Sequence, residues 1–284
     1  MKIFGKKMKT VLKILILLLF IVVLIHIFVA LTLGRSLQYK EIPFHSSKVP
    51  AEMNGYKIAF ISDTHAISAK ELEGIVSRVN QWQTDLVVLG GDFPSIDDAP
   101  KRSMEILSKI ESPDGIFGVE GNHDNYATLF AAMEEYGMHP LSNSGIYPRE
   151  HFYVAGVEDL WNHEPNIEKA IAGTSADDFV LLLAHNPDVT MQQNTTGVDL
   201  ILSGHTHGGQ ITFFGVWAPA LTLRKNITDY GQRFMSGWAQ SHDGTPVYVS
   251  NGAGTFSGIP RVFARPQVIL ITLYFGDSAY SQDH

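Results

Sequence analysis

YKIAFISDTH, residues 56–65, shows the pattern that organises the whole chain. Its first part, Tyr56–Ile61, is mostly apolar, β-branched or aromatic, which is typical of a buried strand. Two chemically active residues, Asp63 and His65, follow at the point where that strand should end. An apolar run followed by Asp, His or Asn recurs four times further along the chain, at Leu89-Gly90-Gly91-Asp92, Gly121-Asn122-His123-Asp124, Ala184-His185-Asn186 and Ser203-Gly204-His205-Thr206-His207-Gly208.

Short apolar runs alternate with amphipathic stretches, and this predicts an α/β fold in which helices cover sheets. In such folds ligands collect beyond the carboxyl ends of the strands. We expect helices over Ala69–Trp82, Pro100–Glu111 and Tyr126–Tyr136. We expect strands over Tyr56–Ile61, Asp85–Gly90, Gly115–Val119, Phe152–Val157, Phe179–Ala184, Val198–Ser203, Pro246–Ser250 and Gln267–Tyr274.

The polar residues at these strand ends form a candidate metal centre. Along an extended strand, residues i and i+2 point to the same side, so Asp63 and His65 can reach one ion if the extended backbone continues, and so can His205 and His207. Imidazole, carboxylate and amide oxygen suit manganese, zinc or iron. The candidate ligands are Asp63, His65, Asp92, Asn122, His185, His205 and His207.

Seven ligands are too many for one tetrahedral ion. If Asp92 bridges, two divalent ions each receive four protein ligands, and positions remain open for water and substrate. Two-metal sites activate hydroxide and clamp the oxygens of an in-line displacement at phosphorus. The glycines beside the ligands, such as Gly121 and Gly204, permit the close approaches that a crowded site needs.

As a set, these motifs resemble the calcineurin-like metallophosphoesterase superfamily, and the resemblance covers about residues 56–275. The chain looks most like the small membrane-associated bacterial branch, which includes phosphodiesterases and UDP-2,3-diacylglucosamine pyrophosphatase-type members. That likeness rests on further segments, Ala184-His185-Asn186-Pro187-Asp188, Gly204–Gln210, Gly252-Ala253-Gly254 and Arg265-Pro266.

The resemblance implies a four-layer α/β/β/α sandwich of two mixed sheets. It also implies that Asp63, His65 and His207 hold the first metal, and that Asn122, His185 and His205 hold the second. Asp92 would bridge the two. His123 would lie over the leaving group, and Asp124, where many relatives carry Glu, would orient it.

The reaction we expect is hydrolysis of a phosphodiester or pyrophosphate, on a lipid-linked substrate such as UDP-2,3-diacylglucosamine. A phosphomonoesterase or protein phosphatase is the alternative enzyme, and a non-catalytic, metal-stabilised membrane scaffold or sensor is the alternative of another class. The apolar segment Phe213–Leu223 is either an edge that meets lipid or a loop packed on the domain. Arg224, Lys225 and Arg233 either pair with substrate phosphates or form surface ion pairs.

The charge of the chain is uneven. Five of its 21 lysines and arginines lie in residues 1–34, which leaves 16 basic against 29 acidic residues, a net charge of −13, for the remainder. Such an acidic body is a poor match for nucleic acid, so no nucleic-acid partner is expected. The absence of cysteine excludes a disulfide framework and thiolate metal ligands. The oligomeric state is left open.

The N-terminus has the pattern of a membrane anchor. Residues 14–34 carry no charge and are long enough to span a bilayer, whereas a cleaved signal, the competing interpretation, has a shorter apolar core. The positive-inside rule places the five preceding lysines in the cytoplasm and the domain outside it, on a single-pass inner-membrane protein. UDP-2,3-diacylglucosamine faces the cytoplasm, which conflicts with that topology. The expected segments are a basic tail (1–13), the anchor (14–34), a linker (35–54), the domain (55–275) and a C-terminal tail (276–284).

Overall fold

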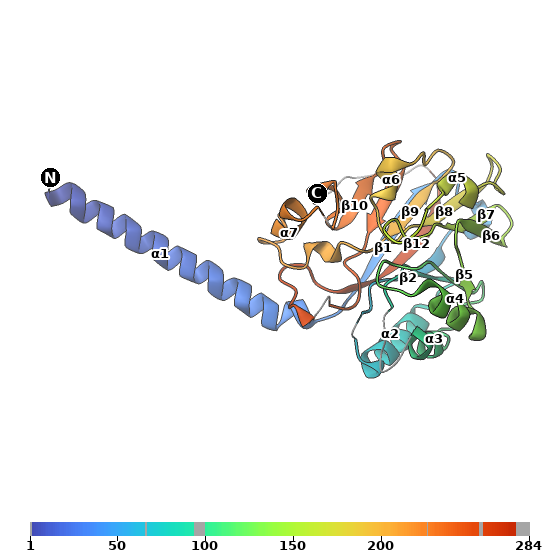
Figure 1. Cartoon of the computed structure of the whole chain (residues 1–284), viewed down its shortest axis with the longest axis horizontal. Coiled ribbons are helices and arrows are strands. Elements are labelled where there is room, and N and C mark those ends of the chain that lie inside the picture. Colours follow the sequence, from blue (N-terminus) through green and yellow to red (C-terminus); the bar gives the residue numbers. More distant parts are fainter. Residues whose placement is uncertain (1, 66, 94–99, 226, 256–257, 277–284) are drawn as a thin grey trace.

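The structure, a computed structural model, describes residues 2–65, 67–93, 100–225, 227–255 and 258–276. Apart from Gly276, the predicted C-terminal tail lies outside the described residues. A long N-terminal helix, α1 (Lys2–Leu31), projects from one end of an α/β domain (Figure 1).

Two six-stranded mixed sheets form the centre of the domain. In the first, β2, β3, β4 and β5 are parallel, and β12 joins β2 antiparallel and β1 parallel. In the second, β7, β8, β9 and β11 are parallel, and β6 and β10 are antiparallel at the edges. The first sheet contains β1 (Gln38–Ser46), β12 (Gln267–Phe275), β2 (Tyr56–Ile61), β3 (Leu86–Leu89), β4 (Ile116–Gly118) and β5 (His139–Pro140). The second contains β10 (Gly237–Gln240), β11 (Pro246–Val249), β9 (Leu200–Ser203), β8 (Phe179–Leu183), β7 (Phe152–Gly156) and β6 (Ser144–Arg149).

Apolar side chains hold the layers together in three clusters. The central cluster joins the two sheets, with Phe60 and Val88 on one side and Phe179 and Leu202 on the other, all fully buried. A second cluster packs three helices on the outer face of the first sheet, and a third packs two four-residue helices and their loops on the second. The expected four-layer α/β/β/α order is therefore confirmed, with a thin fourth layer (Figure 1). These helices are α2 (Ala69–Trp82), α3 (Pro100–Leu107) and α4 (Tyr126–Glu135) on one side, and α5 (Ile167–Ala170) and α6 (Val189–Gln192) on the other.

Helix α2 shows how local sequence fixes an element. Ser68 and Glu71 form a capping box, in which each side chain accepts from the other residue's backbone N–H. The helix stops at Gln83, whose backbone is left-handed. One face is buried on the sheet because its apolar residues recur at helical spacing, at Leu72, Ile75, Val76, Val79 and Trp82.

The range 35–54 is not the plain linker that we expected. It contains β1, which pairs with β12 over nine residues. Phe44 of β1 is buried and lies 6.0 Å, ring to ring, from Phe179 of the second sheet. Polar residues and Pro43 interrupt the apolar pattern of this strand, which is why its sequence resembles a linker. β5, β6 and β10 are also absent from the expected strands.

Helix α1 is long and apolar enough to cross a membrane. It ends at Leu31, before the end of the predicted anchor, and Leu33–Arg35 forms a 3-10 turn. Near that end, Val29 and Ala30 are buried against Val262 of the domain. The anchor is therefore packed on the domain at its carboxyl end.

If β1 belongs to the core, shortening Phe44 must destabilise the domain. We expect Phe44→Ala to lower the free energy of unfolding by about 3–5 kcal/mol, because the change leaves a cavity between the sheets. Chemical denaturation of the detergent-solubilised full chain measures this. Glu52→Ala, at an exposed position, is the control. Equal stability of the two variants would show that β1 is peripheral.

Candidate active site

Four buried ligand groups converge beyond the carboxyl ends of β2, β3 and β9. Asp63 and His65 follow β2, Asp92 follows β3, and His207 lies in a 3-10 turn (His207–Gly209) after β9. One ligand atom from each lies within 4.8 Å of the others. Segments from both sheets thus meet at one point, as the strand-end pattern predicts.

The backbone reaches this point through strained turns. Asp63, His65, Asp92, His205 and His207 all have positive φ, between 41° and 71°. The extended backbone on which the predicted pairing of Asp63 with His65 depends therefore does not continue past β2. Left-handed backbone at a non-glycine residue costs about 1–2 kcal/mol, so the surrounding fold must impose it.

Three further predicted ligands lie beside the first four. The side-chain oxygen Oδ1 of Asn122 lies 3.2 Å from Nε2 of His185 and 2.8 Å from Nδ1 of His205. His185 Nε2 is 3.4 Å from Asp92 Oδ2, and its Nδ1 is 2.7 Å from the carbonyl oxygen of Gly90. The structure therefore brings all seven predicted ligand residues together.

Each carboxylate accepts one hydrogen bond from backbone through its Oδ1 atom. Asp92 Oδ1 accepts from the N–H of His123 at 2.8 Å, and Asp63 Oδ1 accepts from the N–H of His205 at 3.0 Å. Among the described residues, neither Asp92 Oδ2 nor Asp63 Oδ2 has a hydrogen-bond partner, although both are buried. Asp92 Oδ2 lies between His65 Nε2 at 3.5 Å and His185 Nε2 at 3.4 Å. A buried anionic oxygen that has no hydrogen-bond partner and lies beside two imidazoles, as Asp92 Oδ2 does, fits a divalent cation.

The two carboxylates differ in the direction of their pKa shifts. Burial by itself raises the pKa of Asp92, but the charges of the neighbouring His185 and His65 outweigh it, so that the pKa of Asp92 is lowered. Burial also opposes protonation of His185, yet Asp92 and Asp63 raise the pKa of His185 well above its usual value. Burial raises the pKa of Asp63 to about 6.

The other imidazoles favour the neutral form. Burial lowers the pKa of His65 to about 4 and that of His205 to about 3. The pKa of His207 is lowered well below its usual value by burial and then by the charge of Arg261. Neutral imidazole is the form that binds metal.

Asp124 ties two loops together. Its carboxylate accepts from the backbone N–H groups of Asp92 and Phe93, both at 2.7 Å, and of Gly121 at 2.8 Å. The resemblance implies that Asp124 orients His123, whereas these hydrogen bonds fix the backbone around both His123 and Asp92. Burial, with the charge of Asp92, raises the pKa of Asp124 to about 7. His123 is exposed, and its ring lies 5.6 Å from that of His65.

Two glycines are required by the crowding. A Cβ at Gly121 would lie 2.3 Å from Asp92 Oδ1, and one at Gly204 would lie 2.2 Å from Asp63 Oδ2. Real Cβ atoms essentially never come so close. Both positions therefore need glycine for the carboxylates to stay in place.

Arg261 is not among the predicted site residues, although it is the largest fully buried side chain among the described residues. It donates to the carbonyl oxygens of Gly254, His207 and Ala264, at donor–acceptor distances of 2.8, 2.9 and 3.3 Å. Its Nη2 lies 3.1 Å from Nδ1 of the His207 ring. A single arginine without a motif around it leaves no signal in one sequence.

A second set of missed residues surrounds Asn122. The ring of Trp161 meets that of His205 edge-on at 4.5 Å, and Asn162 Nδ2 donates to the carbonyl oxygen of Asn122 at 2.8 Å. Buried Glu120, two residues before Asn122, lies 2.6 Å from His163 Nδ1. Only the position of Glu120 directly before the Gly-Asn-His-Asp motif could have drawn attention to it.

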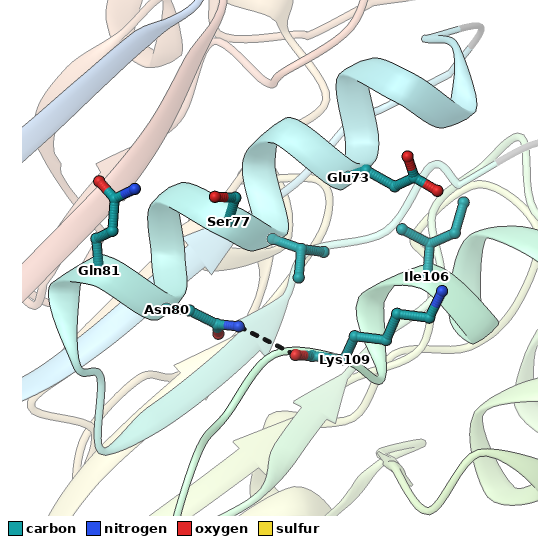
Figure 2. A pocket seen from close by; sticks show the side chains of 7 residues that line it. Glu73, Ser77, Asn80, Gln81, Ile106 and Lys109 are labelled. Carbon is teal, nitrogen blue, oxygen red and sulfur yellow. Dashed lines mark hydrogen bonds between the residues drawn. The ribbon is translucent and has the colours of Figure 1, made fainter.

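A separate cavity of about 580 Å³ lies between α2 and the end of α3 (Figure 2). Asn80 Nδ2 donates across it to the carbonyl oxygen of Lys109 at 3.1 Å. None of its lining residues belongs to the candidate metal cluster, so it is not part of the site. They are Glu73, Val76, Ser77, Asn80, Gln81, Ile106 and Lys109.

Comparison with known proteins agrees with this site. The model of the calcineurin-like phosphoesterase family matches residues 56–209, more than half of the chain. The chain belongs to the calcineurin-like phosphoesterase family. The matched range runs from β2 to the turn that carries His207, and it includes every predicted ligand.

Relatives carry the same family name. An uncharacterized metallophosphoesterase, YkuE, of Bacillus subtilis (strain 168) is 29% identical, and the match covers 80% of this chain and 82% of that protein. A transmembrane protein with metallophosphoesterase domain from Danio rerio is 31% identical over 82% of this chain, which spans 56% of that relative. A solved structure, TT1561 of Thermus thermophilus, has a TM-score of 0.47 and 15% identity over 71% of this chain and 90% of its own.

Arg261 should position His207. We expect Arg261→Met to lower metal affinity about 10–100-fold, since residues behind a ligand typically contribute that much. It should also destabilise the fold, because three buried carbonyl oxygens lose donors. Metal titration and thermal unfolding measure the two effects.

The matched control is Arg265→Met, because the half-buried Arg265 side chain contacts Ser36 rather than the cluster. If Arg261→Met and Arg265→Met bind metal equally well, Arg261 has no positioning role.

Proposed function

We propose that this protein is a two-metal phosphoesterase that hydrolyses phosphodiesters or pyrophosphates. One observation carries the proposal: Asp92 Oδ2 is buried without a hydrogen-bond partner among the described residues, 3.5 Å from His65 Nε2 and 3.4 Å from His185 Nε2. An oxygen so placed suits a bridge between two cations. Asp63, His65 and His207 would hold the first, and Asn122, His185 and His205 the second.

When bound, two divalent cations lower the pKa of water and withdraw charge from phosphoryl oxygens. Nitrogen and oxygen donors accept manganese, zinc or iron. The protein's own part is to hold seven ligand side chains rigidly through Asp124, Arg261 and the backbone. His123 lies at the cluster, and its imidazole would protonate the departing oxygen.

The scaffold alternative explains the site less well. A purely structural metal site is closed by four protein ligands, whereas seven ligand residues shared between two ions leave positions for water and substrate. His123 would have no task in such a scaffold. The family also supports a phosphoesterase.

We further propose that the protein is a single-pass inner-membrane protein with its domain outside the cytoplasm, because five lysines precede the uncharged part of α1 and this helix is packed on the domain. A lipid-linked phosphodiester or pyrophosphate is the proposed substrate class. UDP-2,3-diacylglucosamine itself fits only the opposite orientation, so the side of the membrane and this substrate must be tested together.

The deciding experiment measures turnover by the full chain, purified and loaded with manganese. Bis(p-nitrophenyl) phosphate reports diesterase activity, p-nitrophenyl phosphate reports monoesterase activity, and lipid-linked pyrophosphates extend the screen. Faster diester or pyrophosphate turnover supports the proposal. Turnover of the monoester alone supports the phosphomonoesterase, and a metal-loaded chain that turns over none of them favours the scaffold.

Removing the proposed bridge should remove metal and activity together. We expect Asp92→Ala to lose most bound metal and at least about 100-fold in turnover, the scale at which single catalytic groups contribute. Elemental analysis of the purified variant gives the metal content. The control is Asp178→Asn, a buried carboxylate held by Tyr147, Ser175 and His151. A full metal complement in Asp92→Ala would refute the bridging role.

His123 should act on the leaving group rather than on the metals. We expect His123→Ala to keep its metal but lose about 10²–10⁴-fold in turnover of alkyl diesters, which need a proton on the leaving oxygen. Turnover of p-nitrophenyl diesters should fall much less, because that leaving group departs as an anion. His242→Ala, at an exposed position beside Asp243, serves as control. Unchanged turnover of alkyl diesters would remove His123 from this role.

A further inference from the structure

Large apolar side chains gather on the surface after the last predicted ligand. Val216 and Leu223 are 74% and 78% exposed. Of the apolar segment Phe213–Leu223, Ala218 and Leu221 are buried in the domain. A loop packed on the domain therefore does not account for the side chains that stay exposed. We call these outer residues the 211–223 surface: Ile211, Phe213, Phe214, Val216, Trp217 and Leu223.

The 211–223 surface adjoins α1. The imidazole of His26 in α1 lies 5.5 Å from the ring of Phe213 and 4.8 Å from that of Phe214. Phe263 closes the same group at 5.1 Å from His26. His26 Nδ1 lies 2.8 Å from the carbonyl oxygen of Val22, one turn back in the helix. The only ionisable residue of the uncharged part of α1 is thus surrounded by aromatic rings from the domain.

The join between helix and domain is tight. A Cβ at Gly34 would lie 1.9 Å from the carbonyl oxygen of Arg261, and Val29 is buried against Val262. The end of α1, the 261–263 segment and the 211–223 surface therefore keep a fixed relation to one another.

The length of α1 sets the depth of this surface. The uncharged part begins after Lys13 and the helix ends at Leu31, so it is about 27 Å long at about 1.5 Å per residue. The hydrocarbon core of a bilayer is about 30 Å thick. The helix can cross only if its last turns lie within the bilayer. Phe213 and Phe214, which contact His26 five residues before that end, then lie at the level of the lipid.

We infer that the 211–223 surface is a membrane-docking surface, which inserts into the outer leaflet of the phospholipid bilayer that α1 crosses. Exposed Phe, Trp, Val and Leu side chains suit the boundary between acyl chains and headgroups. Exposed Arg224 and Lys225 follow directly, where cations meet lipid phosphates. The 211–223 surface lies beside α1, which itself would be surrounded by lipid. Lipid, rather than a second copy of the chain, is therefore what this surface contacts.

The absence of native cysteine allows a direct test with single labels. The full chain is reconstituted in phosphatidylcholine vesicles, with a nitroxide on Val216→Cys or, as control, on Glu150→Cys, whose native side chain is 90% exposed between β6 and β7. We expect the label at 216 to be relaxed by oxygen and to lose the broadening caused by a water-soluble nickel chelate. The label at 150 should show the reverse.

A second measurement uses the native tryptophan. Lipids brominated on their acyl chains should quench the fluorescence of the parent chain, and Trp217→Phe should lose most of that quenching, each compared with the same protein in unbrominated vesicles. Equal nickel access at 216 and 150, spin–spin broadening at 216 from a second copy, or unchanged quenching in Trp217→Phe would each overturn the proposal. Turnover of a soluble diester in the same vesicles tests the phosphoesterase proposal separately.

Discussion

The carboxylate of Asp92 is the point on which the site depends. It is buried where the two sheets meet, and burying an anion is costly unless cations or donors surround it. Its backbone N–H and one oxygen are held by the loop that carries His123 and Asp124, while the other oxygen faces His65 and His185. The first sheet supplies the carboxylate, and the second supplies His185. The active geometry therefore exists only while both sheets stay packed.

That packing is what imposes the strained loops. The central apolar cluster fixes the directions in which β2, β3 and β9 end, and the chain must then turn sharply to bring its ligands together. Left-handed backbone at several ligands is unfavourable by itself, so the core stabilises what the site strains. Arg261 also stabilises these loops, because its buried guanidinium donates hydrogen bonds to three carbonyl oxygens, including that of His207. The packed core and the hydrogen bonds of Arg261 together hold the ligands in place.

Much of this can be predicted from the sequence, and the failures have physical reasons. The apolar run predicts β2 residue for residue, since buried strands are continuous apolar runs, and the candidate ligands stand out because each follows such a run. β1 escapes prediction because an edge strand that carries Pro43 and polar residues has no such run. The contacts of Asp124 with backbone, and those of Arg261, escape it because side-chain partners distant in sequence leave no local pattern. The left-handed backbone at Asp63 is not predicted, because the spacing of residues in a sequence does not indicate the φ angle at any one of them.

The join at Gly34 bears on how the protein can be handled in the laboratory. A truncated version that starts after Arg35 would lose the cover over Val262 and leave Phe213, Phe214 and Phe263 without their neighbour His26. Such a fragment would carry an enlarged exposed apolar surface at Val262 and Phe263. These residues directly follow Arg261, which contacts His207. Its aggregation, and any drift in its kinetic constants, would then reflect the cut rather than the native enzyme. Nanodiscs, which keep the helix in place, are the appropriate medium for structural or kinetic work.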